Sequence, residues 1–566
     1  MTYDDATAEV TGPGSRFELI DAEIGGQTLR VFAHLPSTLA AVIDLARGRA
    51  DDLFLIYEDE EWTFGDVIDM ADALASGLAG IGVDRGDRVV IASRNYPDWI
   101  VAFFATLSIG AVAVPVNAWW TAEELSYGIA DCGATVVVAD VERAQRMASD
   151  PAFGSSGVGG VLVRSGGRSV PGFTAIEDLL TVGGAPPAVE VLPDADATIL
   201  YTSGTTGHPK GAVSTHRAVT SALWGFSCRA AIDRLRRDTD DGDDSDGGAP
   251  PIPPCFILTV PLFHATGLIP VMLGSAAAGL KLVMMHKWDP RRALELIERE
   301  QVTNFVGVPT MAWDLLECPD FDRFDTSSLL AIGGGGAAAP PRLVKRVAAG
   351  FPGGRPTIGY GMTETNAYGP QNNGDDYLQR PTSCGRSTPI LDVAILDEGG
   401  DHLPAGEVGE IGFRGPNVIR GYWNDPEATE AAIVDGWLRS GDIGHIDADG
   451  FVYVEDRAKD IVIRGGENIG CTEVESALYE HPAVHEAVVF GVPHERLGEE
   501  VAAAVFPRAG HTIAADDVRS VLREHLAPFK VPSIIVVRDE PLPRNASGKI
   551  MRRTVRDEVV ATRSAR

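Results

Sequence analysis

The strongest constraint on the fold is an alternation of helix-like and strand-like segments. Helical and extended apolar patterns follow one another over residues 64–78, 88–92, 99–107 and 135–139, and they return at residues 281–285, 290–300 and 304–308. Alternation of this kind predicts a layered α/β body with a largely parallel sheet. The body should therefore extend well past the middle of the chain.

The chain is long and strongly acidic. Its 566 residues exceed what one hydrophobic core usually serves, so we expect at least two domains. With 80 acidic and 48 basic residues, the formal net charge is −32. This charge repels polyanions and argues against an extended nucleic-acid or anionic membrane surface. A phosphorylated ligand would have to be held by a local site.

Cysteine spacing and the first residues predict a reducing, cytoplasmic location. The six cysteines lie far apart and form no CxxC pair, so neither a disulfide framework nor a zinc site is expected. Residues 1–10 carry acids where a secretory signal would carry bases. The longest apolar stretch, residues 267–285, is interrupted by Pro270, Ser275 and Lys281, which favours a buried helix-and-strand passage over a membrane span.

An acidic segment rich in glycine and proline interrupts the middle of the chain. Residues 238–254 read DTDDGDDSDGGAPPIPP and show no apolar periodicity, which predicts a solvated loop. A calcium-binding loop is the sharper alternative for its aspartates. The full EF-hand ligand pattern is missing, however, so the solvated loop is preferred.

The pattern changes near residue 451. Residues 451–464 look antiparallel, and a compact set of short helix and strand patterns follows at residues 474–479, 487–492, 501–506, 515–526 and 533–537. We therefore expect a large α/β body of several subdomains over residues 1–456 and a small α+β domain over residues 457–566.

The strongest local signal for chemistry is TSGTTGHPKG at residues 202–211, directly after the apolar strand pattern of residues 197–201. Its glycines let backbone amides approach an anion closely, its hydroxyl groups can donate hydrogen bonds, and Lys210 adds positive charge. The segment is suited to hold phosphates, with a flexible hairpin turn as the structural alternative. It is not a Walker A loop, because no glycine–lysine–hydroxyl run is present.

Five segments in fixed order resemble the adenylate-forming superfamily of acyl-CoA synthetases, luciferases and peptide-synthetase adenylation domains. They are TSGTTGHPKG at residues 202–211, YGMTE at 360–364, SGD at 440–442, DRAKD with the following GGEN at 456–468, and PLPRNASGK at 541–549. The resemblance covers nearly the whole chain. It implies an enzyme that joins a carboxylic acid to AMP from ATP, releases pyrophosphate, and passes the acyl group to a thiol, with the C-terminal domain as a mobile lid.

The resemblance also implies nucleotide and metal contacts. The phosphates would be held by Thr202, Ser203, Gly204, Thr205, Thr206, Gly207 and Lys210. Thr363 would donate to the α-phosphate, and Asp442 and Arg457 would bind the ribose. The adenine would lie among Gly335, Gly336, Ala337, Gly359, Tyr360, Gly361 and Met362, with Tyr360 stacking on the base. Glu364 and Thr206 would hold Mg²⁺, a hard ion that prefers oxygen ligands.

Two further residues are implied in the chemistry. Lys549 would bridge the carboxylate and the α-phosphate and offset charge in the transition state, although an isolated lysine would be a solvated surface group. His264, in PLFHATG at residues 261–267, resembles the family residue that lies beside the carboxylate and gates the acyl tunnel. Its structural alternative is a satisfied core histidine.

The acyl pocket, the thiol path and the hinge follow from the same resemblance. The pocket would include Trp224, Phe263, His264, Val308, Pro309, Gly333, Met362 and Asn366, which suit a fatty, aromatic or ring-bearing acid. Coenzyme A would enter beside Gly465, Gly466 and Glu467, and the lid would turn about Lys459. Ile358 and the stretch from Gly470 to Thr472 depart from the family pattern. Cys471 is not expected to be a nucleophile, because no activating base is evident beside it.

The predicted function is an ATP-dependent acyl-CoA synthetase for a fatty or other hydrophobic carboxylic acid, with ATP, Mg²⁺ and coenzyme A as cofactors and a homodimer left open. The alternative within the superfamily is an acyl-AMP ligase that loads a carrier protein. The GGEN and LFHATG segments favour coenzyme A. A non-catalytic nucleotide sensor would need the ribose contacts Asp442 and Arg457 but not Lys549. The intact PLPRNASGK segment around Lys549 argues against such a sensor.

Overall fold

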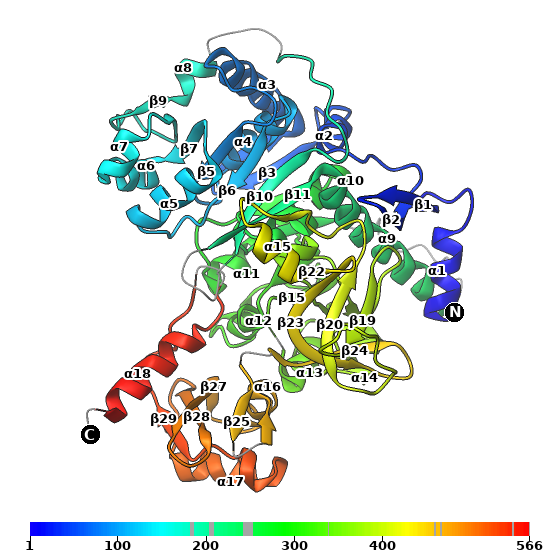
Figure 1. Cartoon of the computed structure of the whole chain (residues 1–566), viewed down its shortest axis with the longest axis vertical. Coiled ribbons are helices and arrows are strands. Elements are labelled where there is room, and N and C mark those ends of the chain that lie inside the picture. Colours follow the sequence, from blue (N-terminus) through cyan, green and yellow to red (C-terminus); the bar gives the residue numbers. More distant parts are fainter. Residues whose placement is uncertain are drawn as a thin grey trace.

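The computed structural model shows a large body and a smaller C-terminal lid that lies below it (Figure 1). It describes residues 1–180, 186–202, 209–240, 253–337, 339–457, 460–464, 467–545 and 548–564. We use "lid" for the described residues from 460 onward. The N-terminus forms a helix, α1 (Tyr3–Thr11), and a two-stranded antiparallel sheet of β1 (Leu19–Ile24) and β2 (Gln27–Phe32). The body and lid both combine helices with sheets, which confirms the predicted fold class.

The first sheet of the body has eight strands, and most of them are parallel. Their order is β21 (Gly421–Tyr422), β11 (Lys210–Thr215), β10 (Asp196–Thr202), β6 (Val112–Pro115), β5 (Arg88–Ala92), β7 (Val136–Asp140), β8 (Gly159–Val163) and β9 (Phe173–Ala175). Pairing is parallel from β10 to β9 and antiparallel at β11 and β21. The accompanying helices are α3 (Phe64–Gly80), α4 (Pro97–Ser108), α5 (Ala122–Cys132), α6 (Val141–Ala148), α7 (Pro151–Ser155) and α8 (Ile176–Leu180).

The second sheet has a parallel centre and antiparallel ends. Its order is β19 (Asp392–Leu396), β20 (Gly409–Arg414), β23 (Trp437–Ile446), β24 (Phe451–Arg457), β18 (Gly385–Arg386), β17 (Gln371–Asn373), β16 (Arg355–Gly359), β15 (Ala331–Gly335), β14 (Asn304–Gly307), β12 (Cys255–Leu258), β13 (Lys281–Met284), β3 (Leu53–Tyr57) and β4 (Glu60–Thr63), with β22 (Ile433–Val434) paired to β23. Pairing is parallel from β16 to β3.

Helices and short turns connect the strands of the second sheet. They are α2 (Leu39–Arg47), α9 (His216–Asp240), η1 (Gly267–Leu273), α10 (Gly274–Ala278), α11 (Pro290–Glu300), α12 (Pro309–Leu316), η2 (Phe321–Arg323), α13 (Pro341–Gly350), η3 (Thr363–Thr365), α14 (Gly374–Gln379) and α15 (Pro426–Ala432).

The lid has its own sheet and core. The strand order is β26 (Glu467–Ile469), β25 (Val462–Arg464), β28 (Gly498–Pro507) and β27 (Val484–His494), and β29 (Ile534–Val537) pairs with β28. Its helices are α16 (Cys471–Leu478), α17 (Ala515–His525), η4 (Pro528–Lys530) and α18 (Arg552–Ser564). Buried side chains of β27, β28 and α16 pack together, so this unit has a hydrophobic core separate from those of the body.

Helix α4 is buried on all sides within the body. Pro97 occupies its first turn, where no backbone donor is needed, and every residue from Pro97 to Leu107 is buried. Trp99 and Phe103 stack with ring centroids 5.4 Å apart. A helix that is apolar on all sides must be enclosed by other elements, and α4 belongs to the largest hydrophobic core.

The structure confirms the predicted alternation and corrects one boundary. Residues 64–78 and 99–107 lie in α3 and α4, and the passage at 267–285 contains η1, α10 and β13, as predicted. The predicted acidic loop starts too early, because α9 continues to Asp240. Its residues 241–252 lie outside the described part of the chain.

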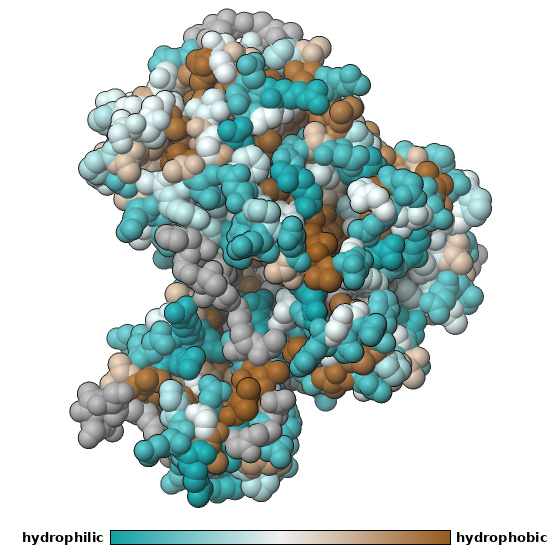
Figure 2. Space-filling view, viewed as in Figure 1, coloured by the Kyte–Doolittle hydropathy of each residue, from teal (hydrophilic) through white to brown (hydrophobic). Residues whose placement is uncertain are grey.

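Hydrophilic side chains cover most of the face seen in Figure 2, and hydrophobic ones occur in scattered groups. Exposed apolar side chains such as Leu330, just before β15, and Ile463 in β25 come from separate parts of the chain. Among the described helices, none combines the length and the apolar character needed to cross a bilayer.

Candidate active site

Strands β10 and β11 bring Thr202 and Lys210 together. The two residues pair in the antiparallel register, and Thr202 Oγ1 donates to the Lys210 carbonyl oxygen across 3.3 Å. The connecting loop carries the predicted phosphate ligands that lie outside the described residues, namely Ser203, Gly204, Thr205, Thr206 and Gly207. The sheet thus fixes both ends of the predicted phosphate loop.

Lys210 faces an acidic and an aromatic side chain from a distant segment. Its Nζ lies 3.6 Å from Asp425 Oδ2 and 5.5 Å from the ring centroid of Tyr422. Tyr422 is in β21, which pairs with β11. The lysine side chain is 34% exposed, so its ammonium group is accessible to an anionic ligand.

Glu364 is a buried carboxylate held by Tyr422. It is 7% exposed, and the Tyr422 hydroxyl donates to its Oε1 across 2.7 Å. Burial raises the pKa of Glu364, and the Tyr422 hydrogen bond opposes that rise. Among the described residues, no group of three or more His, Cys, Asp or Glu side chains could hold a metal ion. Mg²⁺ usually takes one or two carboxylates and completes its shell with phosphate and water oxygens, so Glu364 fits such an ion.

Predicted nucleotide contacts converge on Asp442. This carboxylate is 5% exposed, and its Oδ2 accepts a hydrogen bond from the Tyr360 hydroxyl across 2.7 Å. Its Oδ1 lies 3.2 Å from Arg457 Nε, which faces it across the β23–β24 pairing. Ser440 Oγ accepts from the Asp442 amide across 3.1 Å. Stacking of Tyr360 on the base stays a prediction, and the structure shows a hydrogen bond from its hydroxyl to Asp442 that the motif did not indicate.

The ends of β15 and β16 present backbone in place of bulky side chains. Gly335 pairs with Gly359 in the parallel register. A Cβ at Gly335 would lie 3.7 Å from the Gly359 carbonyl oxygen, and one at Gly336, where φ is +75°, would meet nothing within 4 Å. Ala337 follows directly. A planar ring could approach this backbone closely, which is compatible with the predicted adenine position.

A tight turn follows Tyr360. Gly361 has no room for a side chain, because a Cβ would lie 2.6 Å from the Ala367 carbonyl oxygen. The Met362 amide donates to Thr365 Oγ1 across 3.1 Å at the start of η3. This turn places Thr363 and Glu364 in η3, just after the C-terminal end of β16, and Gly361 allows the close approach of the backbone that the turn requires.

His264 is a neutral histidine next to the ring of Phe263. Its ring centroid lies 4.5 Å from that of Phe263, and Trp119 packs edge-on against Phe263 at 5.8 Å. Loss of hydration lowers the pKa of His264 to about 4. Its Nε2 is shielded from solvent and has no hydrogen-bond partner among the described residues. A shielded polar atom of this kind gains from a ligand that pairs with it.

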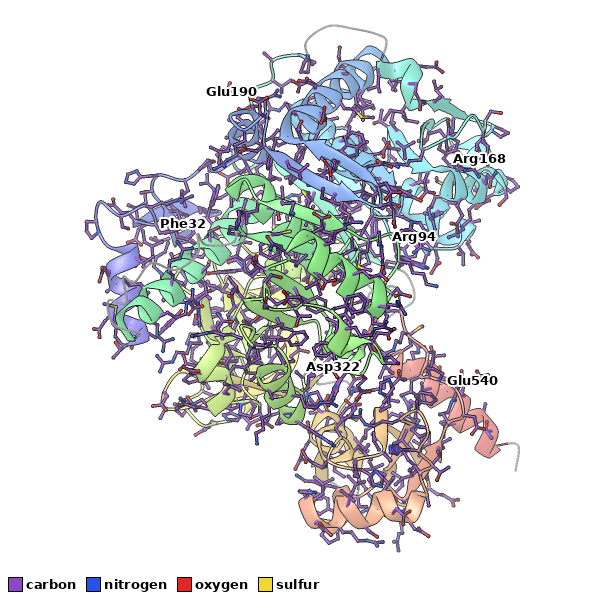
Figure 3. All side chains as sticks on the ribbon, turned by 180° about the vertical axis from the view of Figure 1, so that it is seen from behind. Phe32, Arg94, Arg168, Glu190, Asp322 and Glu540 are labelled. Carbon is purple, nitrogen blue, oxygen red and sulfur yellow. The ribbon has the colours of Figure 1, made fainter. Side chains whose placement is uncertain are left out.

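The C-terminal ends of the parallel strands of the two sheets meet near Arg94 and Asn95. Strand β5 lies between β6 and β7, and β12 lies between β13 and β14, so each is the switch point of its sheet, where ligands of α/β folds bind. Asn95 Nδ2 donates to the Val260 carbonyl oxygen across 3.0 Å, and its Oδ1 accepts from the Leu262 amide across 2.9 Å. Seen from behind, Arg94 lies between the part of the body that contains the first sheet, at the top of the view, and the rest of the body (Figure 3). Asn95 therefore ties the loop after β12 to the first sheet.

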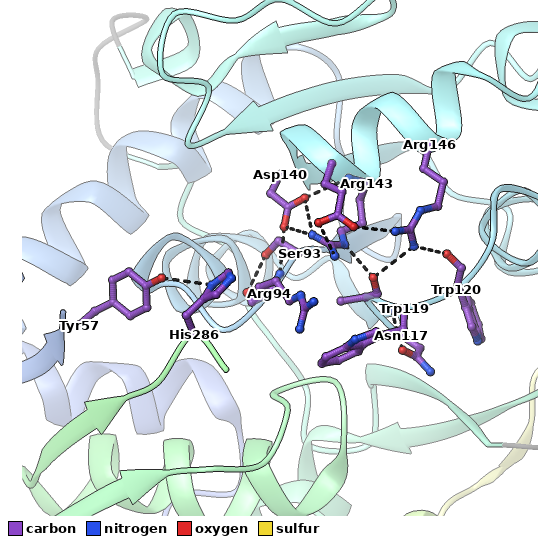
Figure 4. A network of polar contacts seen from close by, with 12 residues as sticks. Tyr57, Ser93, Arg94, Asn117, Trp119, Trp120, Asp140, Arg143, Arg146 and His286 are labelled. Carbon is purple, nitrogen blue, oxygen red and sulfur yellow. Dashed lines mark hydrogen bonds and ion pairs between the residues drawn. The ribbon is translucent and has the colours of Figure 1, made fainter. Parts of the chain in front are cut away.

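A buried ion pair supports this junction (Figure 4). Arg143 Nη1 lies 2.9 Å from Asp140 Oδ2, and its Nε donates to the Ala118 carbonyl oxygen across 2.7 Å. The Arg94 amide donates to Asp140 Oδ2 across 3.1 Å, and the Arg94 guanidinium lies 4.0 Å from the ring centroid of Trp119. No sequence motif predicts this network, because its members lie in three separate segments of the chain.

The predicted acyl-pocket residues border two neighbouring hydrophobic cores. Trp224 and Met362 pack in one core, and Val308 packs in the other. Pro309 begins α12, and Gly333 lies in β15. These residues therefore come from α9, the second sheet and α12 and divide between two hydrophobic cores, and their joint contact with an acyl group stays a prediction.

Trp224 and Asn366 also have structural partners. Trp224 Nε1 donates to the Pro36 carbonyl oxygen across 2.7 Å. Asn366 is fully buried, its Oδ1 accepts from Ser214 Oγ across 3.0 Å, and its Nδ2 donates to the Asn417 carbonyl oxygen across 2.9 Å. The Asn366 amide is thus used inside the body, and its contact with an acyl chain stays a prediction.

The lid presents Lys549 to the nucleotide contacts of the body. Lost hydration and the positive charges of Arg457 and Arg552 lower the pKa of Lys549, while the carboxylate of Asp442 opposes this shift. The side chain nevertheless remains exposed at the junction. The lysine is therefore within electrostatic range of the residues predicted to bind the ribose.

Other predicted lid residues are only partly described. Lys459, Gly465 and Gly466 lie outside the described residues, and Glu467 is exposed at the start of β26. Cys471 is buried, and burial raises the pKa of its thiol. Its Sγ contacts the Asp460 carbonyl oxygen at 3.0 Å, which is consistent with a structural thiol.

Comparison with known proteins decides the family. Residues 44–423 match the family model described as AMP-binding enzyme, and residues 473–549 match the model of the AMP-binding enzyme C-terminal domain. The chain belongs to the AMP-binding enzyme family. This AMP-binding enzyme is an AMP-forming acid–thiol ligase that uses ATP and coenzyme A.

Relatives of this AMP-binding enzyme act on different acids. Long-chain-fatty-acid–CoA ligase FadD13 of Mycobacterium tuberculosis (strain ATCC 25618 / H37Rv) is 34% identical over 509 residues, which cover 89% of this chain and 94% of the relative. Feruloyl-CoA synthase of an Amycolatopsis species is 36% identical over 495 residues, which cover 87% and 93%. The solved anthranilate CoA ligase AuaEII in complex with anthranoyl-AMP matches with a TM-score of 0.81 and 26% identity, over 94% of this chain and 99% of that one.

Proposed function

We propose that this enzyme activates a fatty or other hydrophobic carboxylic acid as its acyl-AMP and then transfers the acyl group to coenzyme A. The observation that carries the proposal is the convergence at Asp442. Tyr360 and Arg457, the last residue of β24, contact this carboxylate, and Lys549 lies within its electrostatic range. We also propose that the body ends at residue 456 and that the lid begins at 457.

In the first step, a carboxylate oxygen of the acid attacks the α-phosphorus of ATP. The bond from that phosphorus to the bridging oxygen breaks, and pyrophosphate leaves. Lys549 offsets the charge that develops between the two anions, and Thr363 donates to the α-phosphate. Lys210 and the loop from Thr202 hold the leaving phosphates. Glu364 and Thr206 would hold Mg²⁺, which would supply further neutralisation of the charge on the leaving group.

In the second step, the thiol sulfur of coenzyme A attacks the acyl carbonyl carbon. The bond from that carbon to the AMP oxygen breaks, AMP leaves, and the thiol proton passes to solvent. His264, being neutral, can pair its shielded Nε2 with the carbonyl oxygen of the acyl group. The lid turns about Lys459 between the steps, so that Gly465, Gly466 and Glu467 replace Lys549 beside the acyl group.

The acid is proposed to be apolar. The predicted pocket residues Trp224, Val308 and Met362 belong to hydrophobic cores, and relatives named for a long-chain fatty acid and for ferulate support an apolar or aromatic acyl group. The free thiols of all six cysteines support a reducing, cytoplasmic location.

Pyrophosphate release across acids of graded chain length and ring content tests the proposal, with and without coenzyme A. We expect release with a subset of apolar acids, and conversion of the acid to its thioester when coenzyme A is present. Accumulation of acyl-AMP despite coenzyme A would favour the alternative of a carrier-protein ligase. No release with any acid would overturn the proposal.

A further inference from the structure

The lid contacts the body at the C-terminal end of α12. Glu317 directly follows α12, and its Oε2 lies 3.3 Å from Nδ1 of His485 in β27 of the lid. Its Oε1 forms an ion pair with Arg508, which directly follows β28. The carboxylate is 23% exposed and the arginine 14% exposed, so the contact is shielded from much of the solvent. In Figure 1, α12 lies at the lower edge of the body, toward the lid.

The same carboxylate has a partner within the body. Arg346 of α13 places its Nη1 3.0 Å from Glu317 Oε1. The guanidinium groups of Arg346 and Arg508 lie 4.7 and 4.9 Å from the ring centroid of Trp313, which is 4% exposed. Arg508 of the lid is therefore held by a carboxylate and by an aromatic face at the same time.

A second contact lies at the N-terminal end of α12 and involves the segment of the lid that carries Lys549, residues 541–549. Arg544 Nη1 donates to Thr310 Oγ1 across 3.1 Å and to the Gly548 carbonyl oxygen across 2.6 Å, and its Nη2 lies 2.7 Å from Glu486 Oε1. A Cβ at Gly548 would lie 3.2 Å from Val308 Cγ2. One short helix of the body thus contacts the lid at both of its ends, and the contact at its N-terminal end involves the loop that carries Lys549.

We propose that Glu317, Arg508 and His485 form a latch that selects the acyl-AMP-forming position of the lid. The three residues are positioning residues, because they act on the reaction only by placing Lys549 against the nucleotide contacts. The inference rests on the proposed function in one respect, namely that the lid turns between the half-reactions. Such a turn carries Arg508 and His485 away from α12, while Glu317 stays with the body.

Arg346 makes this latch reversible. Removing one partner from a shielded ion pair normally leaves an unpaired charge, which is costly. Because Arg346 and Glu317 both belong to the body, Glu317 keeps a cation when the lid leaves, and Trp313 keeps a cation on its ring. Arg508 then regains hydration. The latch can therefore favour one lid position without trapping the enzyme in it.

The activity test compares Glu317→Gln and Arg508→Met in the two half-reactions measured separately. We expect pyrophosphate release to slow about fivefold to tenfold, and acyl-CoA formation from supplied acyl-AMP to be unchanged or faster. The double variant should be no slower than the slower single variant, because both remove the same interaction. His485→Gln, a milder change, should act in the same direction.

Matched controls break ion pairs that do not join the lid to the body. Arg538→Met removes the lid pair with Glu558, whose atoms lie 2.7 Å apart, and Asp320→Asn removes the body pair with Arg291 at 2.6 Å. Both controls should leave the ratio of the two half-reaction rates unchanged. Melting temperatures of all variants exclude general unfolding as the cause.

Hydrogen exchange of the full chain without ligands provides a readout that does not depend on activity. Glu317→Gln should raise amide exchange in α12 and at the facing ends of β27 and β28, and Arg538→Met should not. Equal slowing of both half-reactions, additive effects in the double variant, or unchanged exchange in α12 would each overturn the latch. Lack of pyrophosphate release by the unaltered enzyme would instead overturn the proposed function, and the exchange result would still decide the latch.

Discussion

Tyr422 donates its hydroxyl hydrogen to Glu364 Oε1 across 2.7 Å. The ring of the same tyrosine lies 5.5 Å from Lys210 Nζ. One side chain in β21 therefore contacts both the predicted Mg²⁺ ligand and the lysine of the predicted phosphate loop. The pairing joins two motifs that are far apart in the sequence, and it suggests that the phosphate and metal contacts are oriented together.

Replacing Tyr422 by phenylalanine should impair the first half-reaction. The ring is kept, but the 7% exposed Glu364 carboxylate loses a hydrogen bond of the kind that contributes about 1.5–3 kcal/mol. We expect pyrophosphate release to fall roughly tenfold or more and the Mg²⁺ concentration for half-maximal rate to rise. Tyr453→Phe is the control, since that hydroxyl donates to Asp447 on a hairpin at 3.2 Å. Unchanged Mg²⁺ dependence would argue that Tyr422 has no part in orienting Glu364.

Lys549→Ala should separate the two half-reactions. The lysine is proposed to act only where the carboxylate meets the α-phosphate, so acyl-AMP formation should fall by at least about a hundredfold. Thioester formation from supplied acyl-AMP should change much less. Lys530→Ala is a matched control in the lid, because that lysine pairs with Glu473 at 2.7 Å and lies outside the proposed site. Equal loss in both half-reactions would contradict the assigned role.

Two histidines should make the protein less stable in mild acid. Burial lowers the pKa of His216 and of His264 to about 4 each, and the Leu39 amide donates to His216 Nδ1 across 3.2 Å, which requires the neutral ring. The unfolded chain, with a histidine pKa near 6.5, binds more protons between these values. The free energy of unfolding therefore falls as the pH drops from about 6.5 toward 4, by about 1–2 kcal/mol per histidine at pH 5.

Denaturant titrations of His216→Asn at pH 7 and pH 5 check this expectation. Because buried carboxyls such as Glu364, with a raised pKa, change the slope in the opposite direction, the comparison is between the variant and the unaltered protein. The variant should lose less stability on acidification. His511→Asn, at an exposed position, serves as the control. An identical pH slope in His216→Asn and the unaltered protein would refute the argument.

Local patterns in the sequence predicted those parts of the fold and of the candidate site that depend on a single element or motif. The apolar periodicity of residues 64–78 predicted most of α3, and the SGD and DRAKD motifs contained Asp442 and Arg457, which face each other in a β-hairpin. The end of α9 was missed because residues 238–240 read as part of an acidic loop. The helix continues there, and its last turns carry Arg236, which pairs with Asp376 at 2.9 Å and so stabilises them from a distant segment.

Contacts between distant segments could not be predicted from single motifs. Tyr422 was not in any motif, and its bond to Glu364 depends on the pairing of β21 with β11. Glu317 and Arg508 are likewise charged residues without a distinctive sequence context, and only the docking of the lid on α12 brings them together. Such partners are fixed by strand order and domain placement, which local propensity does not encode.

The hinge can be tested by replacing Lys459 with proline. The described residues on either side are held within their own units: Asp456 pairs with Ile443 in the β23–β24 ladder of the body, and Asp460 pairs with Arg552 of the lid at 2.7 Å. A turn of the lid would therefore be absorbed by the few dihedral angles between them, as in other hinges. Proline restricts φ to about −65° and removes a backbone donor, so it should favour one lid position.

We expect Lys459→Pro to release pyrophosphate in the first turnover at close to the normal rate and to form acyl-CoA at least roughly tenfold more slowly. Lys459→Ala separates the backbone from the side chain, since it removes the ammonium group but leaves the dihedral angles free, and it should support both steps. Rapid-quench measurement of each half-reaction distinguishes the possibilities. If both steps fail together in the proline variant, the change has damaged the fold or the site. If neither step changes, the lid either turns elsewhere or stays in place, and the latch at Glu317 would then have no second position to select against.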